Sequence, residues 1–376
     1  MSRHSAPLPL YRGALRTELT GNSPFDQVLD VAVRHRRRAL ESGSVRALAD
    51  AELALAEAHR RLGQIAESER AWKASFRAAR RLDDHAGMAW ALWCGGTLAR
   101  QRGALALSQR WLRAAVGRAR RSGDADVLGY ARAGYAETGR IRGDYPAVLA
   151  LHQEELDLSR ARGDAEHAVW ALLGIAQIHR NTGAPEHALT LFHEAAEVAD
   201  EADYRAGHAW ALRGIADLLS EQGRTAQALE LLDRAALTCR TLRLTSAWAY
   251  NRKMYGNVLY RDGRYPQAAD VYRAAHAEFE AMGEQRGAAL ARLGLVKSLA
   301  RTGRPAAETA AALDDLHTTF QRIGLLHART MVEKARADFG LPGSGPTDFG
   351  LADSGLPGSG PVPGRRRLTP TGGHSQ

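Results

Sequence analysis

The sequence predicts an all-α protein, a right-handed α-solenoid of about seven helical hairpins followed by a disordered C-terminal tail. Three observations lead to this prediction. Glycines recur every forty residues from residue 63 to residue 303. Each unit divides at its glycine into two runs of about eighteen residues with helical periodicity. From residue 339 the composition changes to Gly, Pro and Ser. Self-similarity at a fixed period of this length is typical of stacked repeats.

The N-terminal region is expected to contain a flexible segment and then a capping helix. Residues 1–22 lack the apolar stretch of a signal peptide, and we expect a cytoplasmic protein with no membrane contact. Residues 23–43 form a helix that starts with Ser23 as N-cap and Pro24 as its first residue. The arginines at 34, 36, 37 and 38 give this helix the polar outer face that a terminal unit needs.

Residues 44–323 contain seven repeats of forty residues. In each repeat a glycine is the expected end of the first helix, because a left-handed residue stops a helix there at little cost. Small residues recur seven positions before each glycine, where two helices would touch closely. Each repeat is therefore expected to be an antiparallel helical hairpin. The turn glycines are Gly63, Gly103, Gly143, Gly183, Gly223, Gly263 and Gly303.

These repeats resemble the tetratricopeptide repeat family in its forty-residue form, which occurs in bacterial regulatory proteins. The resemblance rests on the small residue in the first helix, the turn glycine, a small residue five positions later, such as Ala188, and a bulky one four further on, such as Phe192. His152 departs from the pattern because it replaces an apolar core residue. The resemblance implies a superhelix whose concave groove is lined by the first helix of each repeat.

The C-terminal region is expected to add one capping helix over residues 324–338. Residues 339–376 then form a disordered tail, because a Gly, Pro and Ser composition cannot bury enough apolar surface to offset chain entropy.

The net charge of +9 raises the possibility of nucleic acid as a partner. However, only four of the basic residues are lysines, and a surplus of arginine together with abundant Ala and Gly is typical of a GC-rich genome. No base-reading motif is present, so we do not expect nucleic acid to be the main partner. Cys94 and Cys239 have no ligand-spaced partner and are expected to be small buried residues.

The sequence has no recognisable catalytic or metal-binding motif. It lacks a phosphate-binding glycine loop, a nucleophile elbow, and His or Cys pairs at metal-ligand spacing. We therefore predict a non-enzymatic protein without cofactor or metal.

Three sets of equivalent positions, forty residues apart, lie on the flank of the first helices opposite the core stripe, and we call them columns. They give the predicted partner-binding groove. The aromatic column is Trp90, Tyr130, Trp170, Trp210 and Tyr250; the arginine column is Arg60, Arg100, Arg140 and Arg180; and the polar column includes Glu57, Glu137, Gln177, Asp217 and Asn257.

Two interpretations of these columns remain open. The aromatic residues either cover the junctions between neighbouring repeats or supply anchors for a ligand. The arginines either pair with the acidic residues of the polar column, including Glu57 and Glu137, or bind carboxylates of an acidic partner.

The predicted function is a scaffold that binds a protein or peptide in its concave groove, in a bacterial regulatory or assembly role. The first alternative is a regulator that senses a signalling peptide and alters a second protein interaction. The second, of another class, is a basic protein associated with nucleic acid. An unpaired end helix would also permit self-association.

Overall fold

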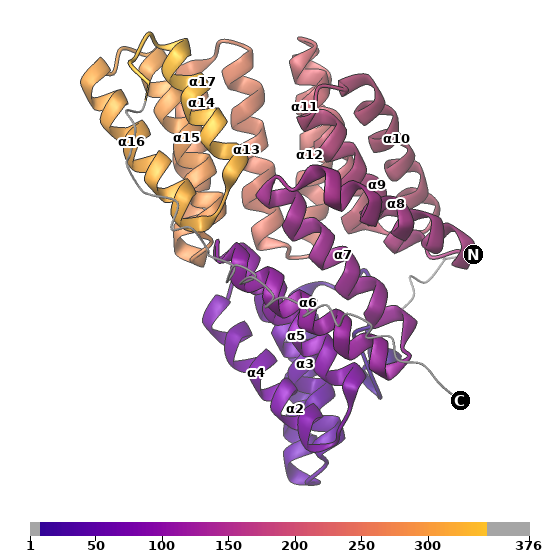
Figure 1. Ribbon diagram of the computed structural model, residues 1–376. Helices are drawn as coiled ribbons and strands as arrows, with labels where there is room; N and C mark the ends of the chain where they lie inside the picture. The colour runs from indigo at the N-terminus through magenta and orange to yellow at the C-terminus, as the bar shows by residue number, and fades with distance from the viewer. Residues whose placement is uncertain (1–7, 344–376) are drawn as a thin grey trace, which may run out of the picture.

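The computed structural model describes residues 8–343, and these residues form seventeen helices without a strand, which confirms the predicted all-α solenoid (Figure 1). Two helices precede the repeats and one follows them. The helices are α1 Leu15–Glu18, α2 Phe25–Glu41, α3 Val45–Arg61, α4 Ile65–Arg81, α5 His85–Gln101, α6 Leu105–Ser122, α7 Ala125–Arg142, α8 Tyr145–Arg162, α9 Ala165–Asn181, α10 Pro185–Glu201, α11 Arg205–Glu221, α12 Thr225–Thr241, α13 Thr245–Arg261, α14 Tyr265–Met282, α15 Gln285–Arg301, α16 Ala306–Ile323 and α17 Leu326–Asp338.

The turn inside each hairpin depends on its glycine. All seven turn glycines have positive φ, up to 100° at Gly303, a region that side chains with a Cβ rarely occupy. The turns between hairpins use the same backbone conformation, but the residue there is not always glycine. Asp83, Asp203 and Arg243 have φ values of 48°, 51° and 55° there.

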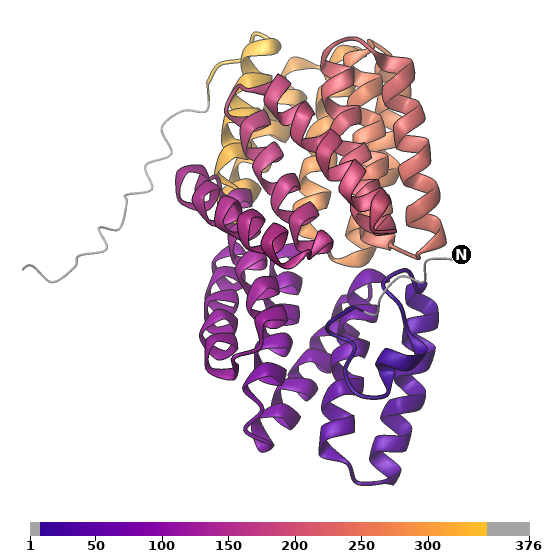
Figure 2. The same ribbon diagram turned by 90° about the vertical axis from the view of Figure 1, so that its right-hand side faces the viewer.

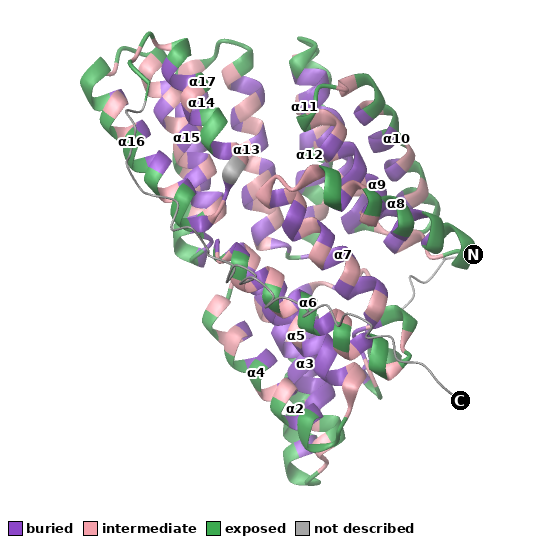
Figure 3. Cartoon of the chain, in the orientation of Figure 1, coloured by how far each residue is buried: buried purple, intermediate pink, exposed green. Residues whose placement is uncertain are grey.

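The first helix of each repeat lies inside the molecule and the second lies outside. In the second repeat, α5 has thirteen buried residues, whereas α6 has five. Figure 3 shows the same contrast between α3 and α4. The columns on the first helices therefore lie on the inner side of the stack, as the tetratricopeptide resemblance implied.

At several junctions between repeats, a bulky side chain of the second helix sits on a glycine of the next first helix. A Cβ on Gly214 would lie 2.4 Å from Phe192, and one on Gly294 would lie 2.3 Å from Tyr272. His152 occupies the equivalent position over Gly174. Burial lowers the pKa of His152 to about 4, so a neutral imidazole serves as the core side chain in that repeat.

The expectation of a flexible N-terminal segment is wrong for residues 8–22. Leu10, Tyr11, Leu15 and Leu19 are almost completely buried and belong to the same apolar cluster as Trp90 and Tyr130 of the aromatic column. Arg12 donates to Asp84 at 3.0 Å. The segment packs because it has four large apolar side chains within ten residues. Only four residues of it form a helix, α1, so these side chains show no helical periodicity in the sequence. Residues 1–7 lie outside the described residues.

The start of the predicted tail also packs against the protein. Phe339 lies against the C-terminal apolar cluster, and the Arg301 guanidinium lies 5.0 Å from the centre of its ring. The prediction of disorder for the rest of the tail concerns residues 344–376, which lie outside the described residues.

The superhelix closes on itself, so that helices far apart in the sequence are in contact. In both views the C-terminal helices α13–α17 lie above the N-terminal helices α2–α6, with the helix ends of the two groups facing each other (Figures 1 and 2). Phe25 N donates to Leu242 O at 3.2 Å, and Asn22 Nδ2 donates to Asp203 O at 2.7 Å. We call α1–α7 the N-terminal half and α11–α17 the C-terminal half; α8–α10 connect them.

Closure continues along the edge where the two halves meet. Gln101 Nε2 donates to Ser246 Oγ at 3.4 Å, and His327 Nδ1 lies 3.1 Å from Ile141 O. A Cβ on Gly103 would lie 2.9 Å from Ile323 Cγ2. The turns of the N-terminal hairpins thus pack against the helix ends of the C-terminal half, and the two halves enclose an interior.

We predict that Gly214→Ala destabilises the protein by about 1–3 kcal/mol, although alanine normally favours a helix. The added Cβ would meet the buried Phe192 ring at 2.4 Å. Chemical denaturation measures the change in unfolding free energy. In a Phe192→Leu background, Gly214→Ala should lower the unfolding free energy by less than it does in wild type. Equal costs in both backgrounds would contradict this packing.

Candidate binding surface on the inner helices

The aromatic column forms a chain of ring contacts between repeats. Centroid distances are 4.8 Å for Trp90 and Tyr130, 5.4 Å for Tyr130 and Trp170, and 6.1 Å for Trp170 and Trp210. Trp90 and Tyr130 are only 1% and 2% exposed, which favours the first interpretation, junction cover, for these two. They cover repeat junctions because the N-terminal half packs several rings together.

The other three aromatic residues are half-buried. Trp170 Nε1 donates to Tyr204 Oη at 2.7 Å. The Arg61 guanidinium lies 5.6 Å from the Trp210 ring centre, and the Arg286 guanidinium lies 4.9 Å from that of Tyr250. Trp210 and Tyr250 thus have cationic neighbours, whereas Trp170 contacts other aromatic rings and Tyr204. A role in binding stays a prediction for Trp170, Trp210 and Tyr250.

The arginine column is largely paired with the polar column, as the first of the two interpretations predicted. Arg60 makes two hydrogen bonds to Glu57, at 2.9 and 2.5 Å, and Arg140 makes two to Glu137, both at 2.7 Å. Burial alone would raise the pKa of Glu57, but attraction to Arg60 and Arg61 outweighs it and lowers that pKa to about 2. Arg140 has the same effect on Glu137.

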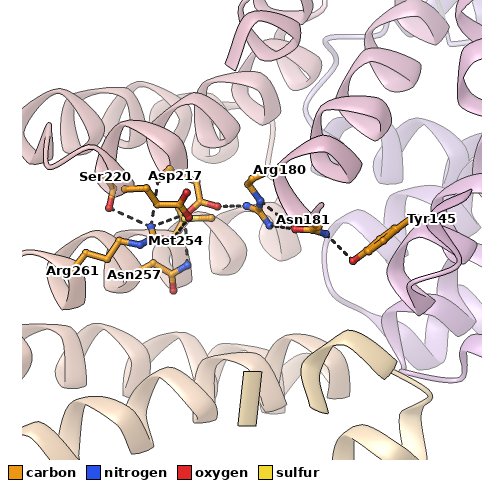
Figure 4. A network of polar contacts seen from close by, with 9 residues as sticks. Tyr145, Arg180, Asn181, Asp217, Ser220, Met254, Asn257 and Arg261 are labelled. Carbon is orange, nitrogen blue, oxygen red and sulfur yellow. Dashed lines mark hydrogen bonds and ion pairs between the residues drawn. The ribbon is translucent and has the colours of Figure 1, made fainter. Parts of the chain in front are cut away.

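Arg180 pairs across a repeat boundary in a wider network (Figure 4). It donates to Asp217, whose other oxygen accepts from Arg261 Nη1 at 2.8 Å. Arg180 also donates to Asn181, and Asn181 donates to Tyr145 at 2.9 Å. The network links α8, α9, α11 and α13, so Asp217 and Arg180 have a structural role in holding these repeats together.

The remaining predicted groove residues have mixed environments. Arg100 donates to the Gly134 carbonyl at 3.3 Å. The Asn257 amide oxygen accepts from Tyr272 at 2.7 Å. Gln177 is half-buried on the inner helix α9. Partner contact by these residues stays a prediction.

Four half-buried cations on the inner side have no carboxylate within ion-pair distance, 4.0 Å, anywhere in residues 8–343. They come from four different inner helices, α5, α11, α13 and α15. Burial lowers the pKa of Lys253 to about 8 and that of Arg100 to about 10. The four residues, which we call the unpaired cations, are Arg100, Arg213, Lys253 and Arg286.

The unpaired cations act on one another across the interior. Arg286 lowers the pKa of both Arg100 and Arg213, after the larger effect of burial. Arg213 contributes to the lowering of the pKa of Lys253. Like charges collected from different repeats cost free energy unless something offsets them, so the cluster is chemically suited to an anionic group.

Sequence reasoning identified only Arg100 of these four. Arg213 and Lys253 occupy the column of Leu173, which lies on the inner flank, and a search of that column for charged residues would have found them. Arg286 lies in the first turn of α15, in the column of Glu166, and only the closure of the superhelix brings it near Arg100.

The structure supplies further findings on the other predicted features. Cys94 and Cys239 are 1% and 3% exposed, which confirms the prediction of burial. Within the described part of the chain, no group of three His, Cys, Asp or Glu residues is arranged to hold a metal ion. Among residues 8–343 no helix is both long and apolar enough to cross a membrane.

Comparison with known proteins agrees with this architecture. Residues 167–236 match the family model described as tetratricopeptide repeat, and residues 18–101 match that of anaphase-promoting complex subunit 5. The matched residues 167–236 are thus tetratricopeptide repeats, and the hairpins on either side have the same architecture. No curated protein is significantly similar to it.

Two solved structures of Rap proteins share the fold. A Rap protein complexed with competence and sporulation factor has a TM-score of 0.55 and 13% identity, over 78% of this chain and 82% of that one. The Rap conjugation gene regulator of the plasmid pLS20, in complex with the Phr* peptide, has a TM-score of 0.61 and 12% identity, over 78% of each chain. Identities this low establish the fold alone.

We predict that Lys253→Met raises the unfolding free energy at pH 7 by about 1–3 kcal/mol. Burial lowers the folded pKa of Lys253 from 10.5 to about 8. The cost of keeping its charge is therefore complete below pH 8 and disappears as the pH rises towards 10.5. Denaturation curves between pH 7 and 10.5 should show the two proteins converging. The exposed Lys73→Met is the matched control, expected to change stability by less than about 1 kcal/mol. A gain for Lys253→Met that does not vary with pH would contradict the assignment.

Proposed function

We propose that this protein binds an acidic peptide or protein segment in the interior of its superhelix and acts as a non-enzymatic regulatory or assembly adaptor. The observation that carries the proposal is the set of unpaired cations, which converge on the interior from four inner helices. A solenoid uses its concave surface for binding, and carboxylates of a ligand would supply the partners that these cations lack.

The aromatic residues support the same proposal. Trp170, Trp210 and Tyr250 are half-buried on inner helices, with Arg61 over the Trp210 ring and Arg286 over that of Tyr250. A segment with both acidic and apolar side chains would therefore find charge pairing and ring contacts on one surface. The Rap structure solved with the Phr* peptide has the same fold, which is consistent with peptide binding by this architecture.

A peptide-sensing regulator is the more specific form of this function. Such a protein must change a second interaction when its ligand binds. The unpaired cations belong to both halves of the superhelix. A ligand that binds them in the interior would therefore change the strength of the contacts between the two halves.

Affinity capture with crosslinking mass spectrometry tests the proposal. We predict that wild type captures a specific protein or peptide, with crosslinks to the inner helices, and that the Trp170→Ala, Lys253→Gln variant loses at least about 90% of it, since one buried anchor and one charge pair together contribute a few kcal/mol.

The matched control is Leu237→Ala, Arg234→Gln, which removes one large apolar and one cationic side chain from the exposed face of α12. It should capture as wild type does. Equal capture by wild type and the inner-helix variant, with both folded by circular dichroism, would overturn the proposal.

A further inference from the structure

A pocket of about 110 Å³ lies where the two halves of the superhelix meet. The N-terminal half contributes Arg60, Arg61 and Gln101 to its lining, and the C-terminal half contributes Arg213, Ser246 and Tyr250. We call it the inter-half pocket. Its volume accommodates a few water molecules or one small polyatomic group.

The charge around the inter-half pocket is strongly positive. Of its three arginines, Arg60 and Arg61 share a single carboxylate, that of Glu57. Arg213 has no carboxylate within 4.0 Å in the described chain. Arg100 and Arg286 lie close enough to interact electrostatically with Arg60 and Arg213 respectively.

One more carboxyl group lies nearby and offsets part of this charge. Glu284 is 1% exposed and accepts from Ser246 Oγ at 2.7 Å. Burial raises its pKa, and Arg286, Ser246 and Tyr250 act in the opposite direction. Even with Glu57 and Glu284 both ionised, the arginines at 60, 61, 100, 213 and 286 leave an excess of positive charge around the pocket.

Hydrogen-bond donors around the pocket also lack protein acceptors. The Tyr250 hydroxyl and Arg286 Nε are buried and make no hydrogen bond within 3.5 Å, although the Glu284 carboxyl lies near enough to the Tyr250 hydroxyl to add to the effect of burial in raising its pKa. The Arg286 guanidinium lies over the Tyr250 ring. Arg213 makes no hydrogen bond in the described chain. Unpaired donors combined with surplus positive charge match the oxygens of an anion, because charge-assisted bonds of this kind are strong.

We propose that the inter-half pocket binds one small oxyanionic group, a carboxylate or a phosphate, and that this group links the two halves of the superhelix. Arg213 and Tyr250 donate to it from the C-terminal half, and Arg60 and Arg61 attract it from the N-terminal half. The inference does not depend on the partner in the proposed function, because a free anion is sufficient to test the pocket.

Thermal unfolding in phosphate, acetate or chloride at equal ionic strength and pH 7.5 tests this site. We expect phosphate or acetate to raise the unfolding temperature of wild type by at least about 2 °C over chloride, since a ligand that binds only the folded state stabilises it. A rise with acetate as well as phosphate indicates a site open to carboxylates; a rise with phosphate alone restricts it to phosphate. No rise with either anion would overturn the proposal.

Two variants locate the effect. Arg213→Gln and Tyr250→Phe should each abolish the anion-dependent rise, whereas Arg234→Gln, on the exposed face of α12, should keep it. Arg213→Gln should also unfold at a higher temperature than wild type in chloride, because it removes an unpaired buried charge. Tyr250→Phe keeps the ring and removes only the hydroxyl, so it tests the site even if Arg213→Gln is poorly folded. An unchanged rise in Tyr250→Phe and Arg213→Gln would overturn the assignment.

Discussion

The spacing between repeats depends on one contact, in which a large side chain of an outer helix sits on a glycine of the next inner helix. Phe192 on Gly214 and Tyr272 on Gly294 are the clearest cases. Helices approach closely where one partner has no Cβ, and a close-packed core tolerates little change in that distance. The contact occurs with Gly134, Gly174, Gly214 and Gly294, whereas Met254 takes the place of the glycine in the sixth repeat. Repeats packed in this way rotate relative to one another, and the rotations add up to a superhelix that meets itself.

Closure of the superhelix decides the chemistry of the interior. An arginine on an open solenoid would be solvated and of little consequence. Here Arg100 and Arg286, from opposite halves, lie close enough to interact electrostatically, and burial lowers the pKa of Lys253 to about 8. The fold thus concentrates positive charge in the interior at a cost in stability. Other arginines of the interior form ion pairs with Glu57, Glu137 and Asp217. Binding proteins commonly accept such a cost at their sites.

The sequence contained enough information to predict the helices, the hairpins and the inner face, because these depend on local periodicity and on glycines at a fixed spacing. It also indicated the pairing of Arg140 with Glu137, which are three residues apart on one helix. Closure was not predictable, since small rotations per repeat must be summed before Gln101 meets Ser246. For the same reason the burial of Trp90 and the position of Arg286 were not evident, and Tyr11 was assigned to a flexible segment.

Pulsed electron paramagnetic resonance between nitroxide labels on α4 and α14 tests closure most directly. Labels at the exposed positions Arg77 and Glu280, with Cys94 and Cys239 replaced by alanine, report the separation of the two halves. Labels at Arg77 and Arg110, on neighbouring outer helices, serve as the reference for a rigid pair. The account predicts one narrow distance distribution for the pair across the halves, as narrow as the reference. A broad or multiple distribution across the halves, with a narrow reference, would contradict a closed superhelix with a shared interior.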